Sequence, residues 1–434
     1  MSQVLTMRVM MLLLLLSTPV QNVLAEDLES AWLEALSHDQ TIQARQSHIL
    51  AAEADLSAAQ AGRLPTLSAS AGITLFNDAP AFDFGAAGIP GILPLFGDDT
   101  MEMANAQLSL PLYAGGTIKH GIDAAQAMLN AQQFQSGAST QQIKLAVAQQ
   151  YINVLRAKSA LDVADTNVKS LSAHVHDVED MWNSGAVARN DYLAAAVSLA
   201  NSEQLRLQAA NGLDLANAAY NRALGRNLSA PVELNENLPG IDPQINLSSL
   251  EALSGLALQN RDELGGLGAA AEAYQSQAES VRGKNKPQLA VTGGYIWLDN
   301  EFLNSNDFWM VGVGVQWNLF DGGQVRKKAN ALSFKSDAAR QEQNNLRSLI
   351  ELQVRQSWLR LNETHERIHL TERAVEQAEE NLRVVRDRYR NGEGTNTEVL
   401  DAEVMRSLSR SNYNNADLDA KLALYELARG VGRL

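Results

Sequence analysis

Two long stretches without helix-breaking residues constrain this chain most. Between Gly116 and residue 181, and between Gly323 and residue 389, there is no proline, and Gly121 and Gly137 are the only glycines. As continuous helices these stretches would each be ~100 Å long at 1.5 Å per residue, which a compact domain does not accommodate. In the second stretch apolar side chains recur every seven residues, as in the seam of a coiled coil: Leu361, Ile368, Val375, Leu382 and Tyr389.

Glycines predict that each long helix turns back on itself. Gly185 and Gly392 each follow a long stretch, and a second helical segment follows each glycine, at 191–224 and 397–428. Glycine is the residue that most readily ends a helix in a left-handed conformation. The sequence therefore predicts two long helical hairpins, at 116–224 and 323–430.

The two hairpins belong to an internal repeat. Leu-Pro-Leu-Tyr-Ala-Gly-Gly at 110–116 resembles Trp-Asn-Leu-Phe-Asp-Gly-Gly at 317–323, an offset of 207 residues that also aligns Gly185 with Gly392 and Gly225 with Gly432. A constant offset over this length indicates a duplication. The first repeat spans 26–226 and the second spans 248–434, and each is expected to contain one helix, then two strands joined by a loop, then a helical hairpin. The linker between them, 227–247, contains three prolines that exclude a long helix.

Four shorter segments predict β-strands, at about 66–76, 104–113, 288–298 and 308–320. Apolar residues alternate in each with small or polar ones. Segments of ~10 residues with this alternation suit both tilted membrane-spanning strands and the strands of an ordinary sandwich. The first repeat carries 15 extra residues within 77–102, a stretch whose glycines and prolines indicate a loop.

The long hairpins favour the membrane interpretation of these strands. Four strands cannot close a barrel around a pore, so several copies of the chain must share one barrel. The apolar faces would then meet lipid, with aromatic side chains forming girdles at the membrane interfaces. The expected lipid-facing aromatics are Tyr295, Trp297, Trp309 and Trp317.

The N-terminus indicates export. Arg8 precedes a short leucine run at 12–16, and Val23-Leu24-Ala25 offers small residues for cleavage, so 1–25 is a predicted signal peptide. There is no cysteine, which excludes disulfides, Cys-ligated metals and cysteine nucleophiles. The formal charge of −15 argues against a nucleic-acid partner.

Taken together, these features resemble the TolC family of outer-membrane efflux and secretion channels. The resemblance rests on the duplication, on the strand end at 110–116, and on two segments of the second repeat, Tyr389-Arg-Asn-Gly392 and Glu398-Val-Leu-Asp401-Ala. It implies an α+β membrane protein of the Gram-negative cell outer membrane: a homotrimer with a 12-stranded β-barrel, continued by a periplasmic α-helical coiled-coil barrel with an equatorial belt at the linker.

The resemblance also implies a function. Channels of this family are passive exit ducts of tripartite efflux pumps or type I secretion systems. They receive small molecules or proteins from a periplasmic adaptor and an inner-membrane pump of the RND, ABC or MFS class. No enzyme activity, cofactor or bound metal is expected.

Family resemblance places a gate at the periplasmic end of the helices. Glu398 and Asp401 match the acidic ring at the narrowest point, while Tyr389, Asn190 and Asp191 match the residues that lock the helices together. Gly394 occupies the place of a basic residue in that lock, which argues against the family's salt bridge there. The adaptor would dock on the hairpin turns, at Gly185, Ala186, Val187, Gly392 and Glu393.

Two alternatives come from other classes of protein. A periplasmic coiled-coil adaptor would also contain a long hairpin, but it would have one hairpin and no membrane-type strands. His365-Glu-Arg-Ile-His369 matches the H-E-x-x-H pattern of zinc metalloproteases. Because Ile368 lies on the coiled-coil seam, both histidines should face away from it, and no histidine follows to supply a third ligand.

Overall fold

The structure is a computed structural model that describes residues 25–78, 80–85, 88, 90–94, 99–243, 245, 249–299 and 304–434. The predicted signal peptide, apart from Ala25, and part of the 77–102 insertion lie outside these residues. The chain divides into a helical unit, assigned residues 1–42, 139–260 and 350–434, and a unit with the main sheet, assigned 43–138 and 261–349.

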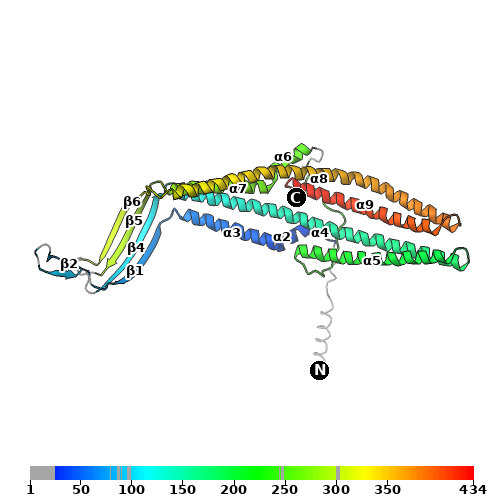
Figure 1. The fold of residues 1–434 in the computed structure, drawn as a ribbon, viewed down its shortest axis with the longest axis horizontal. Coiled ribbons are helices and arrows are strands. Elements are labelled where there is room, and N and C mark those ends of the chain that lie inside the picture. Colours follow the sequence, from blue (N-terminus) through cyan, green and yellow to red (C-terminus); the bar gives the residue numbers. More distant parts are fainter. Residues whose placement is uncertain are drawn as a thin grey trace, which may run out of the picture. The chain divides into compact units, whose positions relative to one another are not determined.

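The two long stretches are single helices. Helices α4 (Thr117–Asn183) and α8 (Gln324–Arg390) each have 67 residues and contribute to both units. Each turns back into a shorter helix, α5 (Arg189–Leu224) or α9 (Asn396–Gly430), as Figure 1 shows. Each repeat therefore contains one helical hairpin.

Two helices, where the sequence suggested one, precede the strands of each repeat. They are α2 (Leu28–His38) and α3 (Gln40–Ala61) in the first repeat, and α6 (Leu250–Asn260) and α7 (Asp262–Gly283) in the second. In the first pair the break has a local cause. The Asp39 carboxylate accepts hydrogen bonds from the backbone N–H groups of Thr41 and Ile42, at 2.7 and 3.1 Å, and so caps the start of a new helix.

Buried tyrosines tie the linker to the helical unit. The Tyr151 hydroxyl donates to the backbone carbonyls of Glu26 (2.6 Å) and Asn235 (2.8 Å), and the Tyr425 hydroxyl donates to Pro239 (2.6 Å). Burial raises the pKa of Tyr151 to about 12, so its hydroxyl stays protonated as a donor. These rings belong to a core that also includes Leu28, Ile152 and Tyr220. The linker backbone is thus held by specific bonds although it forms no helix within residues 227–243.

The main sheet has four antiparallel strands in the order β1-β4-β5-β6. They are β1 (Thr66–Leu75), β4 (Thr100–Tyr113), β5 (Gln288–Leu298) and β6 (Asp307–Gln316), and β2 (Ala81–Asp83) and β3 (Ile92–Pro94) form a separate short hairpin. Strands β1 and β6 have one neighbour each in the sheet, so they are its edges. An open sheet edge exposes unpaired backbone groups that another chain can satisfy.

Strand register brings most of the apolar residues of the four strands to one face. One row across the sheet is Leu67, Leu108, Gly293 and Val311, and the next is Ala69, Ala106, Tyr295 and Trp309. A row on the opposite face is Ser68, Gln107, Gly294 and Met310. The rings of Tyr295 and Trp309 lie 4.9 Å apart, and Trp297 pairs with Asp307 on the same face. Three of the four expected aromatics therefore share one face.

The last strand is shorter than the sequence predicted. It ends at Gln316, which pairs with Gln288, the first residue of β5, so the following residues have no partner strand. Trp317 consequently lies beyond the sheet, where its indole nitrogen donates to the Asn285 carbonyl at 3.0 Å. Trp317 is therefore not a strand residue as predicted, although its side chain is exposed.

Glycines at the 207-residue offset have the same unusual backbone. Positive φ angles occur in the pairs Gly115–Gly322, Gly116–Gly323, Gly185–Gly392 and Gly225–Gly432. Side chains are strained in this conformation, which explains why both repeats use glycine where a strand meets a long helix and where each hairpin turns. The duplication itself stays an inference from the sequence.

Candidate functional site at the hairpin tips

Each hairpin turn is a glycine-terminated helix end. The amide of Gly185 donates to the Trp182 carbonyl (2.9 Å) and that of Ala186 to Met181 (2.8 Å). The second turn repeats this arrangement, with Gly392 bonded to Tyr389 (3.0 Å) and Glu393 to Arg388 (2.8 Å). These bonds satisfy the last carbonyls of α4 and α8. Gly185, Ala186, Gly392 and Glu393 are exposed on the turns and Val187 is half-buried.

Glu398 has a local task that the sequence analysis did not anticipate. Its carboxylate accepts from the backbone N–H of Thr395 (2.9 Å), and the Thr395 hydroxyl accepts from the backbone N–H of Glu398 (3.3 Å). This capping box begins α9. Glu398 and Asp401 nevertheless both lie on the exposed face of the helix, while Val399 and Ala402 face the core. Their assignment to an acidic ring stays a prediction, because a ring requires several copies of the chain.

Tyr389 differs from the expected lock. Its ring is buried between the hairpins with Val178, Leu382 and Val385, and its hydroxyl has no hydrogen-bond partner among the described residues. Burial, followed by the nearby Asp191 charge, raises the pKa of Tyr389. Because Tyr389 belongs to the apolar seam, its contribution in this chain is packing.

Asn190 and Asp191 begin α5 beside the second hairpin. The Asn190 side chain donates to the Asp191 carboxylate at 3.3 Å. The Asp191 backbone carbonyl accepts from the Asn396 side chain at 3.0 Å, which links α5 to the start of α9. Asn396, which the sequence analysis overlooked, thus links Asp191 to the second hairpin.

A buried ionic cluster joins the two hairpins further along. Glu403 of α9 is 1% exposed and contacts Arg386 of α8 and Arg406, the latter at 3.2 Å. Ser170 of α4 donates to Glu403 at 2.9 Å and is bonded by Arg386 at 2.6 Å. The cluster therefore fixes three helices to one another. Charges that are this buried are found paired, as here.

One ion pair crosses between the hairpins, nearer the turn. Arg390 of α8 binds Asp177 of α4 at 2.7 Å. This pair provides a salt bridge between the hairpins although position 394 is glycine. Arg386 and Glu403 both belong to the second hairpin and reach the first through Ser170. A Cβ atom at Gly394 would lie only 3.2 Å from both the Tyr389 nitrogen and the Glu398 carboxylate. Local crowding thus favours glycine there. None of the residues in these ion pairs stands out by sequence pattern, because charged residues are common along both helices.

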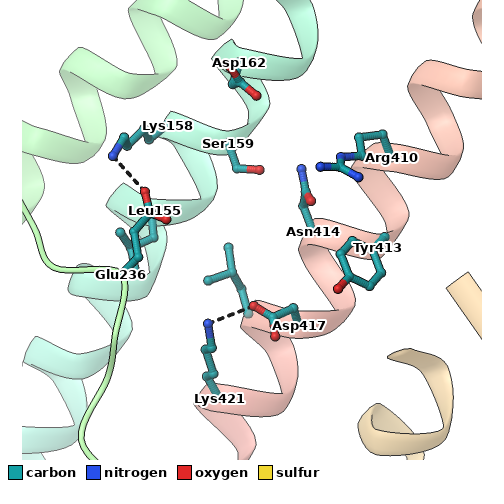
Figure 2. A pocket seen from close by; sticks show the side chains of 11 residues that line it. Leu155, Lys158, Ser159, Asp162, Glu236, Arg410, Tyr413, Asn414, Asp417 and Lys421 are labelled. Atoms are coloured by element: carbon teal, nitrogen blue, oxygen red, sulfur yellow. Dashed lines mark hydrogen bonds and ion pairs between the residues drawn. The ribbon is translucent and has the colours of Figure 1, made fainter. Parts of the chain in front are cut away.

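A pocket of about 430 Å³ also lies between the hairpins. It is lined by residues within 155–162 of α4 and within 410–421 of α9, and by Glu236 of the linker (Figure 2). Both lysines that line it form salt bridges, Lys158 with Glu236 (2.9 Å) and Lys421 with Asp417 (2.8 Å). Ser159 also lines it, but no histidine does, so the pocket lacks an imidazole base for a serine nucleophile.

The H-E-x-x-H residues lie on the surface of α8. His365 and His369 are both exposed, with ring centroids 6.0 Å apart. No group of three or more metal-ligating side chains suited to an ion occurs among the described residues. A catalytic zinc site uses three protein ligands, so these histidines do not fit the protease pattern. Within the same residues, none of the helices combines the length and hydrophobicity needed to cross a membrane.

Comparison with known proteins identifies the class of this chain. BepC, an outer membrane efflux protein of Brucella suis biovar 1, is 19% identical over 419 residues, which are 95% of this chain and 87% of BepC. The outer membrane protein TolC of Vibrio cholerae is 23% identical over 321 residues, 72% of this chain and 73% of TolC. The solved structure of VceC, an outer membrane protein of Vibrio cholerae, has the same fold, with a TM-score of 0.79 at 18% identity over 94% of this chain and 96% of that one.

The sequence also matches the outer membrane efflux protein family over residues 33–226 and 253–433, which takes in most of both repeats. This match confirms the resemblance to TolC-type channels and excludes the coiled-coil adaptor. With both repeats and all four strands of the main sheet accounted for, the chain belongs to the outer membrane efflux protein family.

Proposed function

We propose that this protein is a passive exit duct in the outer membrane, through which a tripartite efflux pump or a type I secretion system discharges its cargo. The observation that carries the proposal is the four-stranded sheet, whose register collects most of the apolar residues on one face and most of the polar ones on the other. An apolar face suits lipid, and the opposite polar face suits a water-filled lumen. Family membership supports the same role.

The two open edges of the sheet support an oligomer. In a membrane, unpaired strand edges are costly because no water is present to satisfy their backbone groups. Pairing β6 of one copy with β1 of the next removes both edges. Three copies would supply 12 strands, enough for an open pore. The proposed state is therefore a homotrimer, with the hairpins forming a helical tunnel on the periplasmic side.

The hairpin tips are the proposed gate and docking site. The Arg390–Asp177 salt bridge and the hydrogen bonds described above hold the two hairpins of one chain together. Opening would therefore require that they be broken or rearranged. The exposed turns at Gly185 and Gly392 offer a surface for a periplasmic adaptor, which would in turn contact an inner-membrane pump. The duct itself performs no chemistry in this proposal.

Native mass spectrometry of detergent-extracted outer membranes tests the assembly. A stable trimer, together with channel activity in planar bilayers, is the expected result. A stable monomer, or a trimer that conducts no ions under any condition, would contradict the proposal. A metal assay of the same preparation is the control for the H-E-x-x-H residues.

A further inference from the structure

His174 is the buried titratable residue at the centre of the hairpin tips. It lies in α4 and is 3% exposed, whereas His176 on the same helix has a side chain that is 75% exposed. Its ring packs 5.5 Å from the buried ring of Tyr389. Full burial of a histidine between two hairpins means that its protonation state affects how they pack.

A chain of two hydrogen bonds connects His174 to the starts of both returning helices. His174 Nε2 lies 2.7 Å from Asn396 Oδ1, and Asn396 Nδ2 donates to the Asp191 carbonyl at 3.0 Å. Because the Asn396 amide group donates to Asp191, its oxygen accepts from His174, so neutral His174 carries its proton on Nε2. This chain joins α4, α9 and α5 at the tip.

Charged side chains act on His174 from three helices: Asp177 on α4, Arg386 on α8 and Glu403 on α9. Arg390 of α8 pairs with Asp177, and Asp191 of α5 meets Asn396 through its backbone carbonyl. The positive and negative charges are largely paired with one another, in Arg386–Glu403 and Arg390–Asp177. An added proton on His174 therefore meets no free carboxylate in these pairs, and its charge must be accommodated in a buried site.

The balance of these effects favours neutral His174 in the packed tip. Burial lowers the pKa of His174, the Asn396 hydrogen bond raises it, Arg386 lowers it, and Glu403 and Asp177 raise it, with a net lowering. A histidine with an ordinary pKa of about 6.5 becomes charged more readily once the tip opens to water. The contribution of neutral His174 to the stability of the packed tip is therefore complete above the ordinary pKa, which applies to the open tip. This contribution decreases as the pH falls from the ordinary pKa towards the lower pKa of the packed tip.

We propose that His174 is a proton-responsive link: its Nε2–H group holds α4 to the starts of α9 and α5, and because a charged ring is costly in this buried position, protonation of Nδ1 in an acidified periplasm favours opening of the hairpin tips. The inference rests on the proposed function, because it assigns the residue through which that gate responds to pH. It adds one proton-linked step per chain, and therefore three in the proposed trimer.

The absence of cysteine allows the tip to be probed directly. Ala186→Cys, at an exposed turn residue, carries the only thiol in the chain. Spin labels there report the distances between the tips of an assembled trimer, independently of conduction. The label-to-label distances and the single-channel open probability are measured from pH 7.5 to pH 5.0. The proteins compared are the parent, which keeps His174, the variant His174→Gln and the matched control His176→Gln. The Gln side chain at 174 can donate to Asn396 but does not titrate in this range.

We expect the parent and the His176→Gln control to show longer tip distances and a higher open probability below about pH 6.5. The ratio of open to closed tips should rise by up to about tenfold per chain for each pKa unit that separates the open and packed states of His174. His174→Gln should be flat across this range. A second variant, His174→Phe, should also be flat but more open at pH 7.5, because it lacks the donor to Asn396.

Two results would overturn the inference: an unchanged pH response in His174→Gln, or a parent protein whose tips do not move with pH. If the preparation forms no trimer or never conducts, the proposed function fails instead. Tip distances that still respond to pH through His174 in a non-conducting trimer would preserve the link and reject the duct.

Discussion

Replacing Leu108 by lysine tests the assignment of the two sheet faces. Leu108 lies near the middle of β4, between Leu67 of β1 and Gly293 of β5, and is 45% exposed in the single chain. If this face meets lipid, a lysine near the bilayer midplane costs ~2–4 kcal/mol. That corresponds to roughly a 30- to 900-fold loss for each chain, because about 1.36 kcal/mol is a factor of ten. A trimer contains the substitution three times, so its total cost is ~6–12 kcal/mol.

The adjacent residue is a matched control. Gln107 lies on the same strand but in the row of Ser68 and Gly294, on the opposite face. We expect Gln107→Lys to assemble normally, since that face would line a wet lumen, and Leu108→Val to assemble as well because it stays apolar. Heat-modifiable trimer bands from extracted outer membranes measure assembly. Equal tolerance of lysine at 107 and 108 would show that the face assignment, or the membrane location of the sheet, is wrong.

Three further changes test the hairpin tips. The double variant Glu398→Ala with Asp401→Ala should weaken cation preference and block by multivalent cations in planar bilayers, because a ring of carboxylates attracts cations; unchanged selectivity would place the ring elsewhere. Glu403→Ala removes the carboxylate of the buried cluster with Arg386 and should lower the free energy of unfolding by ~3–5 kcal/mol. This loss should appear as a lower thermal midpoint of the helical circular dichroism signal, and an unchanged midpoint would refute a stabilising role for the pair. Tyr389→Phe should leave open probability nearly unchanged because the hydroxyl has no hydrogen-bond partner among the described residues. A large increase would indicate a bond formed only between copies.

Local sequence pattern was sufficient for the long elements. A helix of 67 residues needs only the absence of glycine and proline clusters and a regular apolar seam, so α4 and α8 could be predicted closely. Glycine at 185 and 392 predicted both turns because a positive φ angle is a local requirement. Period-two alternation likewise predicted which residues share a face of the sheet.

Partners distant in sequence could be decided only by the tertiary structure. Strand β6 ends at Gln316 because β5 begins at Gln288, which the alternation beyond Gln316 could not reveal. His174 and Asn396 are 222 positions apart, and nothing local marks either as a partner. Their bond exists because two hairpins pack side by side and bury both polar groups, which must then satisfy one another. Sequence by itself therefore determined the elements and the family resemblance, whereas packing determined which polar residues connect the hairpins.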